Sequence, residues 1–290
     1  MRTALCSTHS AVRNTKKCLY MRKIKVGIIG CGTIGSEIAR ACQTRLKNSI
    51  DLVGICDLIE ERAQLLQNSL KDKPPILKLD DLVKRSGLIV EAAGANISAD
   101  ILKKAINGKK DVLIMSVGGL LGNESLLENA RNSGVRVYLP SGALCGIDGL
   151  KSASVGRIDS VTLTTRKPPK GLAGAPYIVK NNIDLSSIKE ETIIFEGTAS
   201  DAVKGFPQNV NVAAILSLAG LGAANTRVRI VTSPEITKNI HEVEIKGESG
   251  NITTRTENLP SKVNPKTSQL AVFSAIATLK GIVKSVRIGT

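Results

Sequence analysis

The spacing of apolar residues changes near the middle of the chain. In the first half, short apolar runs predict buried strands at residues 23–29, 51–56, 87–92, 111–115 and 135–139. Segments with helical spacing lie between these runs, at residues 36–46, 59–69, 99–107 and 123–133. Strands that alternate with helices predict a parallel sheet covered on both faces. The first half is therefore predicted to be a doubly wound α/β domain of the Rossmann type.

The second half has a different pattern. Several of its predicted strands alternate apolar and polar residues, at 159–166, 192–196, 226–232, 239–246 and 251–257. Two segments rich in Ala and Leu, 210–221 and 267–282, predict helices. Consecutive strands with few crossovers predict a mainly antiparallel sheet with helices on one side, an α+β domain.

These patterns divide the chain into three parts. Residues 23–142 form the predicted dinucleotide-binding domain, to which the C-terminal helix is expected to return. Residues 143–290 form the predicted catalytic and oligomerisation domain. Residues 1–22 are basic and contain no acid, which indicates a disordered or alternatively initiated extension, with a targeting segment as the alternative.

Composition narrows the class of protein further. Aromatic residues make up only 2%, so stacking on nucleic-acid bases is disfavoured, and the net charge of +15 is scattered along the chain. A small acidic substrate or a phosphate-bearing cofactor fits that charge better than nucleic acid does. The six cysteines form no CxxC pair, which indicates reduced thiols rather than a zinc site or disulfides. No apolar run reaches membrane-spanning length, so we expect a soluble, cytoplasmic protein.

A glycine-rich turn follows the first predicted strand. Gly30 permits the tight turn, Gly32 lets the backbone approach a pyrophosphate, and Gly35 lets helix and strand pack closely. The free N–H groups at the helix start, at Thr33 and Ile34, add an anion site. The simpler interpretation is an ordinary turn from strand to helix. The position directly after a strand favours a dinucleotide site.

Asp57 ends the second strand, where a carboxylate accepts hydrogen bonds from the adenosine ribose hydroxyls. It would repel a ribose 2′-phosphate, so NAD is predicted over NADP, although the nearby Arg62 leaves NADP open. Its alternative role is to cap the next helix. Ala93 and Gly94 follow the third strand, at the sheet edge that lines the ligand crevice, where ordinary loop chemistry is the alternative.

His241 is one of two histidines, and the other, His9, lies in the basic extension. Period-two spacing places His241, Val243 and Ile245 on one sheltered face of a strand. A buried imidazole is often a structural hydrogen-bond partner. Because histidine exchanges protons near neutral pH, His241 is also the best candidate in the chain for a general acid or base.

Two polar clusters precede predicted helices, at residues 206–211 and 258–268. Their Asn, Ser and Thr residues have a default interpretation as helix N-caps. A helix N-terminus with hydroxyls and a lysine also favours a bound carboxylate, because its N–H groups and its dipole both attract an anion.

Several motifs together resemble those of L-aspartate dehydrogenases. They are the Gly30 turn, Pro140-Ser141-Gly142-Ala143, Gly146-Ile147-Asp148, Thr165-Arg166-Lys167-Pro168-Pro169, residues 206–214, His241-Glu242-Val243 and Asn264-Pro265-Lys266-Thr267-Ser268. The resemblance implies a homodimer that pairs a Rossmann domain with a sheet-and-helix catalytic domain. It implies oxidation of L-aspartate to iminoaspartate with NAD or NADP, which feeds NAD biosynthesis or yields oxaloacetate and ammonia.

The resemblance also assigns roles to residues. The active-site histidine of the family falls on His241, and its cofactor contacts fall on Ala143 and Asn211. From their chemistry, the residues expected to bind the two substrate carboxylates are Asn209, Lys266, Thr267 and Ser268. The alternatives are a related reductase or dehydrogenase acting on a semialdehyde or a cyclic imine, and a non-catalytic NAD-binding redox sensor.

Overall fold

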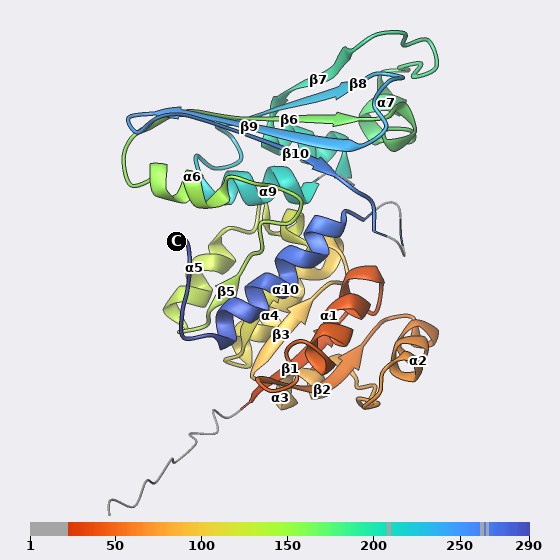
Figure 1. Cartoon of the computed structure of the whole chain (residues 1–290), viewed down its shortest axis with the longest axis vertical. Coiled ribbons are helices and arrows are strands. Elements are labelled where there is room, and N and C mark those ends of the chain that lie inside the picture. Colours follow the sequence, from red (N-terminus) through yellow and green to blue (C-terminus); the bar gives the residue numbers. More distant parts are fainter. Residues whose placement is uncertain (1–22, 208–209, 262–263, 265–266) are drawn as a thin grey trace, which may run out of the picture.

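The computed structural model describes residues 23–207, 210–261, 264 and 267–290. In this part of the chain the strands form two five-stranded sheets, one above the other in Figure 1. The lower sheet contains, in spatial order, β2 (Ile50–Cys56), β1 (Ile24–Ile29), β3 (Leu88–Glu91), β4 (Asp111–Ile114) and β5 (Val137–Tyr138). All its pairs are parallel, as predicted.

A single parallel bridge extends the lower sheet beyond β2. It joins Ile55 to Ile76, whose neighbours Pro75 and Leu77 exchange backbone hydrogen bonds with Ile55. If this bridge is counted as a third strand, the spatial order is 3-2-1-4-5-6, the order of a Rossmann fold. The chain reverses direction across the sheet between β1 and β3, so a crevice for ligands is expected above their carboxyl ends.

Helices cover both faces of the lower sheet. One face packs against α1 (Thr33–Gln43), α2 (Glu60–Ser69) and α10 (Gln269–Val283), and Ala275 and Leu279 of α10 are fully buried there. The other face packs against α3 (Leu79–Arg85), α4 (Ala95–Asn107) and α5 (Ser125–Asn132). The last helix of the chain therefore lies on the first sheet, beside α1 (Figure 1). The predicted doubly wound arrangement is confirmed.

Two details of this domain differ from the prediction. Helix α1 begins at Thr33 rather than at residue 36, because Gly32 is its N-cap. Helix α3 was not predicted. Its acidic first turn and basic last turn, Asp80-Asp81 and Lys84-Arg85, suit the helix dipole, but seven residues are too few for clear helical periodicity.

The upper sheet contains, in spatial order, β10 (Gly250–Asn258), β9 (Asn239–Gly247), β6 (Ile158–Lys167), β8 (Thr226–Thr232) and β7 (Thr192–Thr198). Its pairs are antiparallel except β6 with β8, which are parallel because a long connection with helices separates them. The predicted, mainly antiparallel sheet is confirmed with this one exception.

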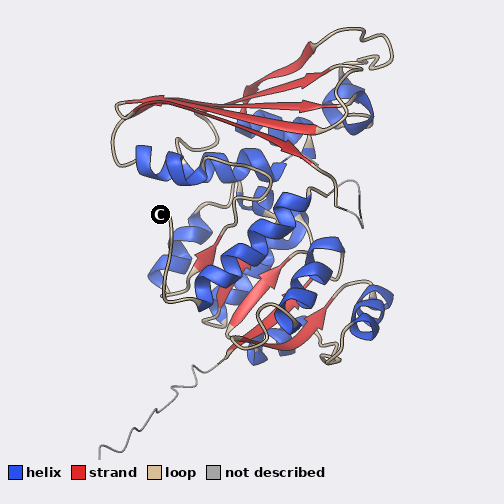
Figure 2. Ribbon diagram, viewed as in Figure 1, coloured by secondary structure: helices blue, strands red, loops and turns tan. Residues whose placement is uncertain are grey.

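One face of the upper sheet is covered by α6 (Ile147–Ala153), α8 (Ala199–Gly205) and α9 (Val210–Ala219) (Figure 2). Helix α7 (Pro176–Lys180) and the 3₁₀ turn η2 (Pro169–Gly171) follow β6. Helices α6, α7 and α8 were not predicted, because they have five to seven residues and show little periodicity. The opposite face carries the polar positions of the alternating strands.

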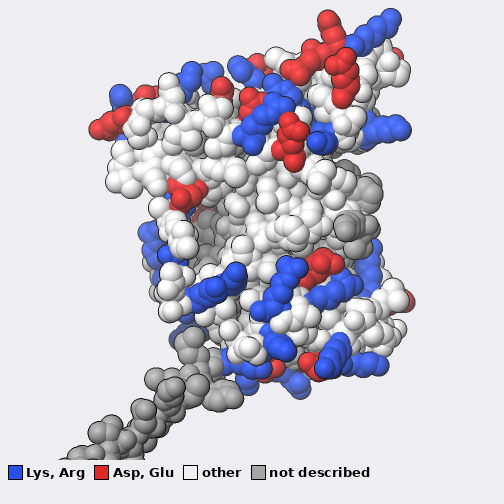
Figure 3. Space-filling view, viewed as in Figure 1, with Lys and Arg blue, Asp and Glu red and all other residues white. Residues whose placement is uncertain are grey.

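Helix α9 connects the two sheets. It lies below the upper sheet (Figure 2) and packs against the 3₁₀ turn η1 (Val117–Leu120), which follows β4 of the lower sheet. Figure 3 shows charged side chains gathered above and below this level, with a mainly uncharged belt between them. No helix of the described chain is long and apolar enough to span a membrane.

Candidate active site

Three glycines shape the turn between β1 and α1. Gly30 has a φ of +95°, and a Cβ there would lie 2.4 Å from the carbonyl oxygen of Ala92. A Cβ on Gly35 would lie 1.8 Å from the carbonyl oxygen of Gly30. A Cβ on Gly32 would meet nothing within 4 Å. Gly30 thus permits the turn and Gly35 permits the close packing of α1. At Gly32 no protein atom fills the space beside the backbone, so a ligand can approach it.

The open side of this turn fits a diphosphate. Thr33 and Ile34 begin α1, and the first N–H groups of an α-helix have no partner within the helix. These donors and the helix dipole favour an anion. Because Gly32 places no side chain there, the residues present suit a dinucleotide, which would lie across the turn.

Asp57 holds the glycine turn to the end of β2. Its Oδ2 accepts a hydrogen bond of 2.6 Å from the Cys31 amide, and its Oδ1 accepts one of 2.8 Å from the Ile59 amide. Asp57 is not the N-cap of α2, because that position belongs to Ile59, so the capping alternative is wrong; the ribose role of Asp57 stays a prediction. Burial, and then the charge of Asp57, raise the pKa of the Cys31 thiol to about 12, so this thiol stays protonated.

The carboxylate of Glu91 binds the two loops that follow β3 and β4 at the predicted crevice. Sequence reasoning did not assign this role to it. Its side chain is fully buried at the end of β3. Oε1 accepts hydrogen bonds from the amides of Ala93 and Gly94 and from the Ser116 hydroxyl, at 2.8, 3.0 and 2.8 Å. Oε2 accepts one of 2.9 Å from the Ser116 amide. The signal in the sequence was a carboxylate that ends an apolar run.

One hydrogen bond links the crevice loops to the second domain. The Gly118 amide in η1 donates to Oδ1 of Asn211 in α9, at 2.9 Å. Asn211 was predicted to contact the cofactor, and Gly118 lies in the loop after β4, two residues beyond Ser116. The bond therefore places the Asn211 side chain beside one of the loops at the edge of the predicted crevice.

His241 lies on the helix-covered face of β9, with 5% of its surface exposed. Its Nδ1 is hydrogen-bonded to Oγ1 of Thr165, at 3.1 Å, across the β6–β9 pair. Burial, with a smaller contribution from the charge of Lys167, lowers the pKa of His241 to about 3. The imidazole is therefore neutral near pH 7.

Two β10 residues connect His241 to the loop before α6: Thr256, which sequence reasoning did not single out, and Asn258, which it named only within the polar cluster 258–268. Oγ1 of Thr256 lies within hydrogen-bonding distance of the carbonyl oxygens of His241 and Ala143, at 3.2 and 3.3 Å. Nδ2 of Asn258 donates to the same Ala143 oxygen at 3.1 Å, and its Oδ1 accepts from the Ser268 hydroxyl at 2.8 Å. Period-two spacing in 250–258 was the signal available, because it places both residues on the face of His241.

The structure thus brings His241, Ala143 and Ser268 into one hydrogen-bonded group. Thr267 takes part in the adjoining turn through its backbone: its amide donates to Asn264 and its carbonyl accepts from Ser261. Two other predicted substrate residues, Asn209 and Lys266, lie outside the described residues.

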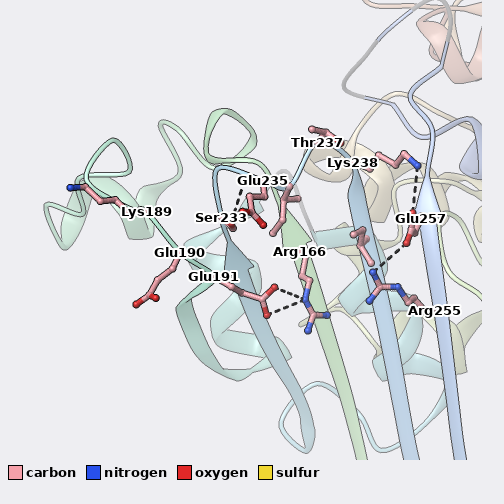
Figure 4. A pocket seen from close by; sticks show the side chains of 12 residues that line it. Arg166, Lys189, Glu190, Glu191, Ser233, Glu235, Thr237, Lys238, Arg255 and Glu257 are labelled. Atoms are coloured by element: carbon pink, nitrogen blue, oxygen red, sulfur yellow. Dashed lines mark hydrogen bonds and ion pairs between the residues drawn. The ribbon is translucent and has the colours of Figure 1, made fainter.

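A separate hollow of about 550 Å³ lies on the opposite face of the upper sheet (Figure 4). Several of its charges are paired: Arg166 with Glu191 at 3.4 Å, and Glu257 with both Arg255 and Lys238, at 3.2 and 3.5 Å. Arg166 and His241 belong to neighbouring strands but point to opposite faces. The hollow is therefore not part of the group around His241.

The fold and the open glycine turn define a two-domain, Rossmann-type oxidoreductase that uses a pyridine nucleotide. Comparison with known proteins agrees. Residues 30–140 match the family described as "Homoserine dehydrogenase, NAD binding domain", and residues 148–282 match "Aspartate dehydrogenase, C-terminal".

Similarity extends over nearly the whole chain. It is 48% identical to the L-aspartate dehydrogenase of Methanosarcina acetivorans over 271 residues, which cover 92% of this chain and 100% of that protein. It is 40% identical to that of Bradyrhizobium diazoefficiens, covering 92% and 95%. The aspartate dehydrogenase structure from Thermotoga maritima superposes with a TM-score of 0.71 at 27% identity, covering 92% and 100%. The chain belongs to the L-aspartate dehydrogenase family.

Proposed function

We propose that this protein oxidises L-aspartate to iminoaspartate with NAD as the hydride acceptor. The observation that carries the proposal is the contact of Thr256 with the carbonyls of both His241 and Ala143. This contact joins β9, which carries the candidate base His241, to the loop before α6, whose residue Ala143 is expected to contact the cofactor. The names of the relatives supply the substrate, and the net charge of +15 suits a dicarboxylate.

His241 is proposed as the general base. The substrate amine must be neutral, so that its lone pair stabilises the iminium that forms, and a base must take its proton. The proposal requires the tautomer in which Nδ1–H donates to Oγ1 of Thr165, because only then does Nε2 of the neutral imidazole keep its lone pair to accept the proton. A bound nicotinamide would supply the acceptor for the hydride that leaves the substrate α-carbon. His241 then assists the addition of water to the imine where oxaloacetate and ammonia are the products.

Asp57 supports NAD rather than NADP. Its carboxylate lies against the glycine turn, where it would accept from ribose hydroxyls and repel a 2′-phosphate. Ser268, Thr267, Asn209 and Lys266 are proposed to bind the substrate carboxylates. The Ser268 hydroxyl donates its one proton to Oδ1 of Asn258, so it would exchange that partner for the carboxylate. Holding the substrate against the ring is the larger part of catalysis, worth roughly 7–11 kcal/mol in effective molarity.

The test is the absorbance of reduced nicotinamide when NAD or NADP is mixed with L-aspartate at varied concentration. Steady NADH production with aspartate, no NADH production with homoserine, and no consumption of NADH or NADPH with dihydrodipicolinate are the expected results. Reduction with homoserine alone would establish the semialdehyde-linked alternative. Binding of NADH without turnover of any of the three compounds would leave the redox sensor and overturn the proposal.

A further inference from the structure

A hollow of about 510 Å³ lies at the amino ends of the lower-sheet strands, away from the group around His241. Its lining includes Lys25 of β1, Leu88, which begins β3, Asp111, which begins β4, and Arg136, which directly precedes β5. These strands are parallel, so the crevice expected at their carboxyl ends is at the other edge of the sheet. The hollow is therefore separate from the candidate active site.

The lining of this basic hollow carries a large excess of positive charge. It contains one acid, Asp111, and six basic residues: Lys23, Lys25, Lys84, Arg85, Lys110 and Arg136. The six come from four segments, which are the start of β1, the end of α3 and the residues just before β4 and β5. The hollow on the upper sheet (Figure 4) is lined by four basic and four acidic residues, so an excess of this kind is not general to hollows of this protein.

Most of the six cations have no acidic partner. Asp111 pairs with Arg136 at 2.9 Å, and Asp81 pairs with Lys84 at 3.7 Å. The Lys110 ammonium donates to the backbone oxygen of Lys84, at 3.1 Å. Within the described part of the chain, three further cations of the hollow form no ion pair: Lys23, Lys25 and Arg85. Four positive charges of the hollow thus lack a carboxylate partner among the described residues.

Two simpler roles account for only part of this charge. Lys84 and Arg85 end α3, where cations suit the helix dipole, and scattered surface cations keep a protein soluble. Neither role requires cations from four segments to line one hollow. Like charges held together destabilise the compact state, and apolar walls, here Ile24, Leu88 and Ile282, concentrate their field. A bound anion would offset the repulsion.

We propose that the basic hollow binds a short oligophosphate, a compact ligand with several negative charges. The ammonium groups and the planar guanidinium of Arg85 would form charge-assisted hydrogen bonds to the phosphate oxygens. The volume of the hollow is that of a small-molecule site, about 300–1,000 Å³, which favours a compact anion over an extended acidic segment of a protein. No aromatic residue is among the described residues of the lining, so a nucleobase finds no stacking surface there.

The first test is calorimetric titration of the whole protein with inorganic tripolyphosphate at low ionic strength. Lys23→Gln combined with Lys25→Gln should raise the Kd about 10-fold, because each exposed charge contributes roughly threefold. The matched control is Lys189→Gln combined with Lys246→Gln, two exposed lysines of the second domain, which removes the same charge. Its Kd should stay within about twofold of the wild type. Absence of binding to the wild type, or an equal loss in the control, would overturn the inference.

Competing ligands distinguish the oligophosphate from other anions. Excess NADH should leave the Kd for tripolyphosphate unchanged, because the cofactor crevice is at the opposite edge of the sheet. Displacement by NADH would place the anion in that crevice and contradict the proposal. Tighter binding of ATP, of a single-stranded oligonucleotide or of polyglutamate than of tripolyphosphate would identify a different ligand class and also contradict it.

Thermal unfolding provides a measurement that does not depend on calorimetry. Without the anion, the Tm of the Lys23→Gln, Lys25→Gln protein should be no lower than that of the wild type, because removal of like charges relieves repulsion. Tripolyphosphate should raise the Tm of the wild type more than that of the variant, since a ligand stabilises the folded state that binds it. An equal rise in both proteins would show that the two lysines do not hold the anion.

Discussion

The buried carboxylate of Glu91 accepts hydrogen bonds from both the amide and the hydroxyl of Ser116, at 2.9 and 2.8 Å. Glu91 ends β3 and Ser116 follows β4, so this contact ties together the two loops at the edge of the cofactor crevice. Glu91 also accepts from the amides of Ala93 and Gly94. The amides of that loop are therefore engaged with a carboxylate of the protein itself.

Removal of the Glu91 carboxylate should loosen both loops. Glu91→Ala leaves four donors without their acceptor, so we expect a loss of roughly 3 kcal/mol in the free energy of unfolding. The Kd for NADH should rise about 10-fold. Urea unfolding and fluorescence titration measure the two effects. Glu124→Ala is the control, since Glu124 is exposed and accepts from one backbone amide; an equal loss there would contradict the role of Glu91.

Substitution of two glycines in the turn should affect different properties, stability for Gly35 and NADH binding for Gly32. Gly35→Ala places a Cβ 1.8 Å from a backbone oxygen, so about 2–3 kcal/mol of stability should be lost. Gly32→Ala meets no protein atom within 4 Å and should change stability by less than about 1 kcal/mol. It should still weaken NADH binding about 10-fold or more, because the methyl group occupies the open side of the turn. Normal NADH affinity in Gly32→Ala would show that the diphosphate lies elsewhere.

Asp57 should set the choice of cofactor. Asp57→Ser removes the charge that opposes a 2′-phosphate and an acceptor for ribose hydroxyls, so kcat/KM should fall about 10-fold with NAD and rise with NADP. The ratio of the two values is the measurement. Asp51→Ser, an exposed change in β2, the strand directly before Asp57, should leave that ratio unchanged. An unaltered preference in Asp57→Ser would remove this residue from the cofactor site.

His241→Ala should separate chemistry from binding. We expect turnover to fall about 10²- to 10⁴-fold, the usual contribution of a general base, while NADH binding stays near normal. His9→Ala, in the basic extension, is the matched control and should keep full activity. Full activity in His241→Ala would eliminate the proposed mechanism.

His241 should also limit stability in acid. Its pKa is lowered in the folded state from 6.5 to about 3, so below pH 6.5 the unfolded chain binds a proton that the folded chain does not. The free energy of unfolding should therefore be unaffected above pH 6.5 and fall as pH decreases from about 6.5 towards 3. Urea titrations of the wild type and His241→Asn across this range measure the difference. Parallel curves for the two proteins would show that the imidazole is not buried in its neutral form.

Much of the fold followed from local pattern. The apolar runs predicted every strand of both sheets to within about two residues. The short helices α3, α6, α7 and α8 were missed, because their stability comes from packing rather than from their own periodicity. The parallel pairing of β6 with β8 depends on the connection between them, which no local pattern encodes.

The sequence by itself determined the strand-and-helix order, the glycine turn and the chemical identity of the candidate base, because these depend on residue type and short-range spacing. Only the tertiary structure placed Thr256 and Asn258 between His241 and Ala143, residues about 100 positions apart along the chain. Likewise, only folding made Glu91 an acceptor for two loops and brought Thr165 of β6 beside His241 of β9. Such relationships arise from strand pairing and burial, which act between distant segments.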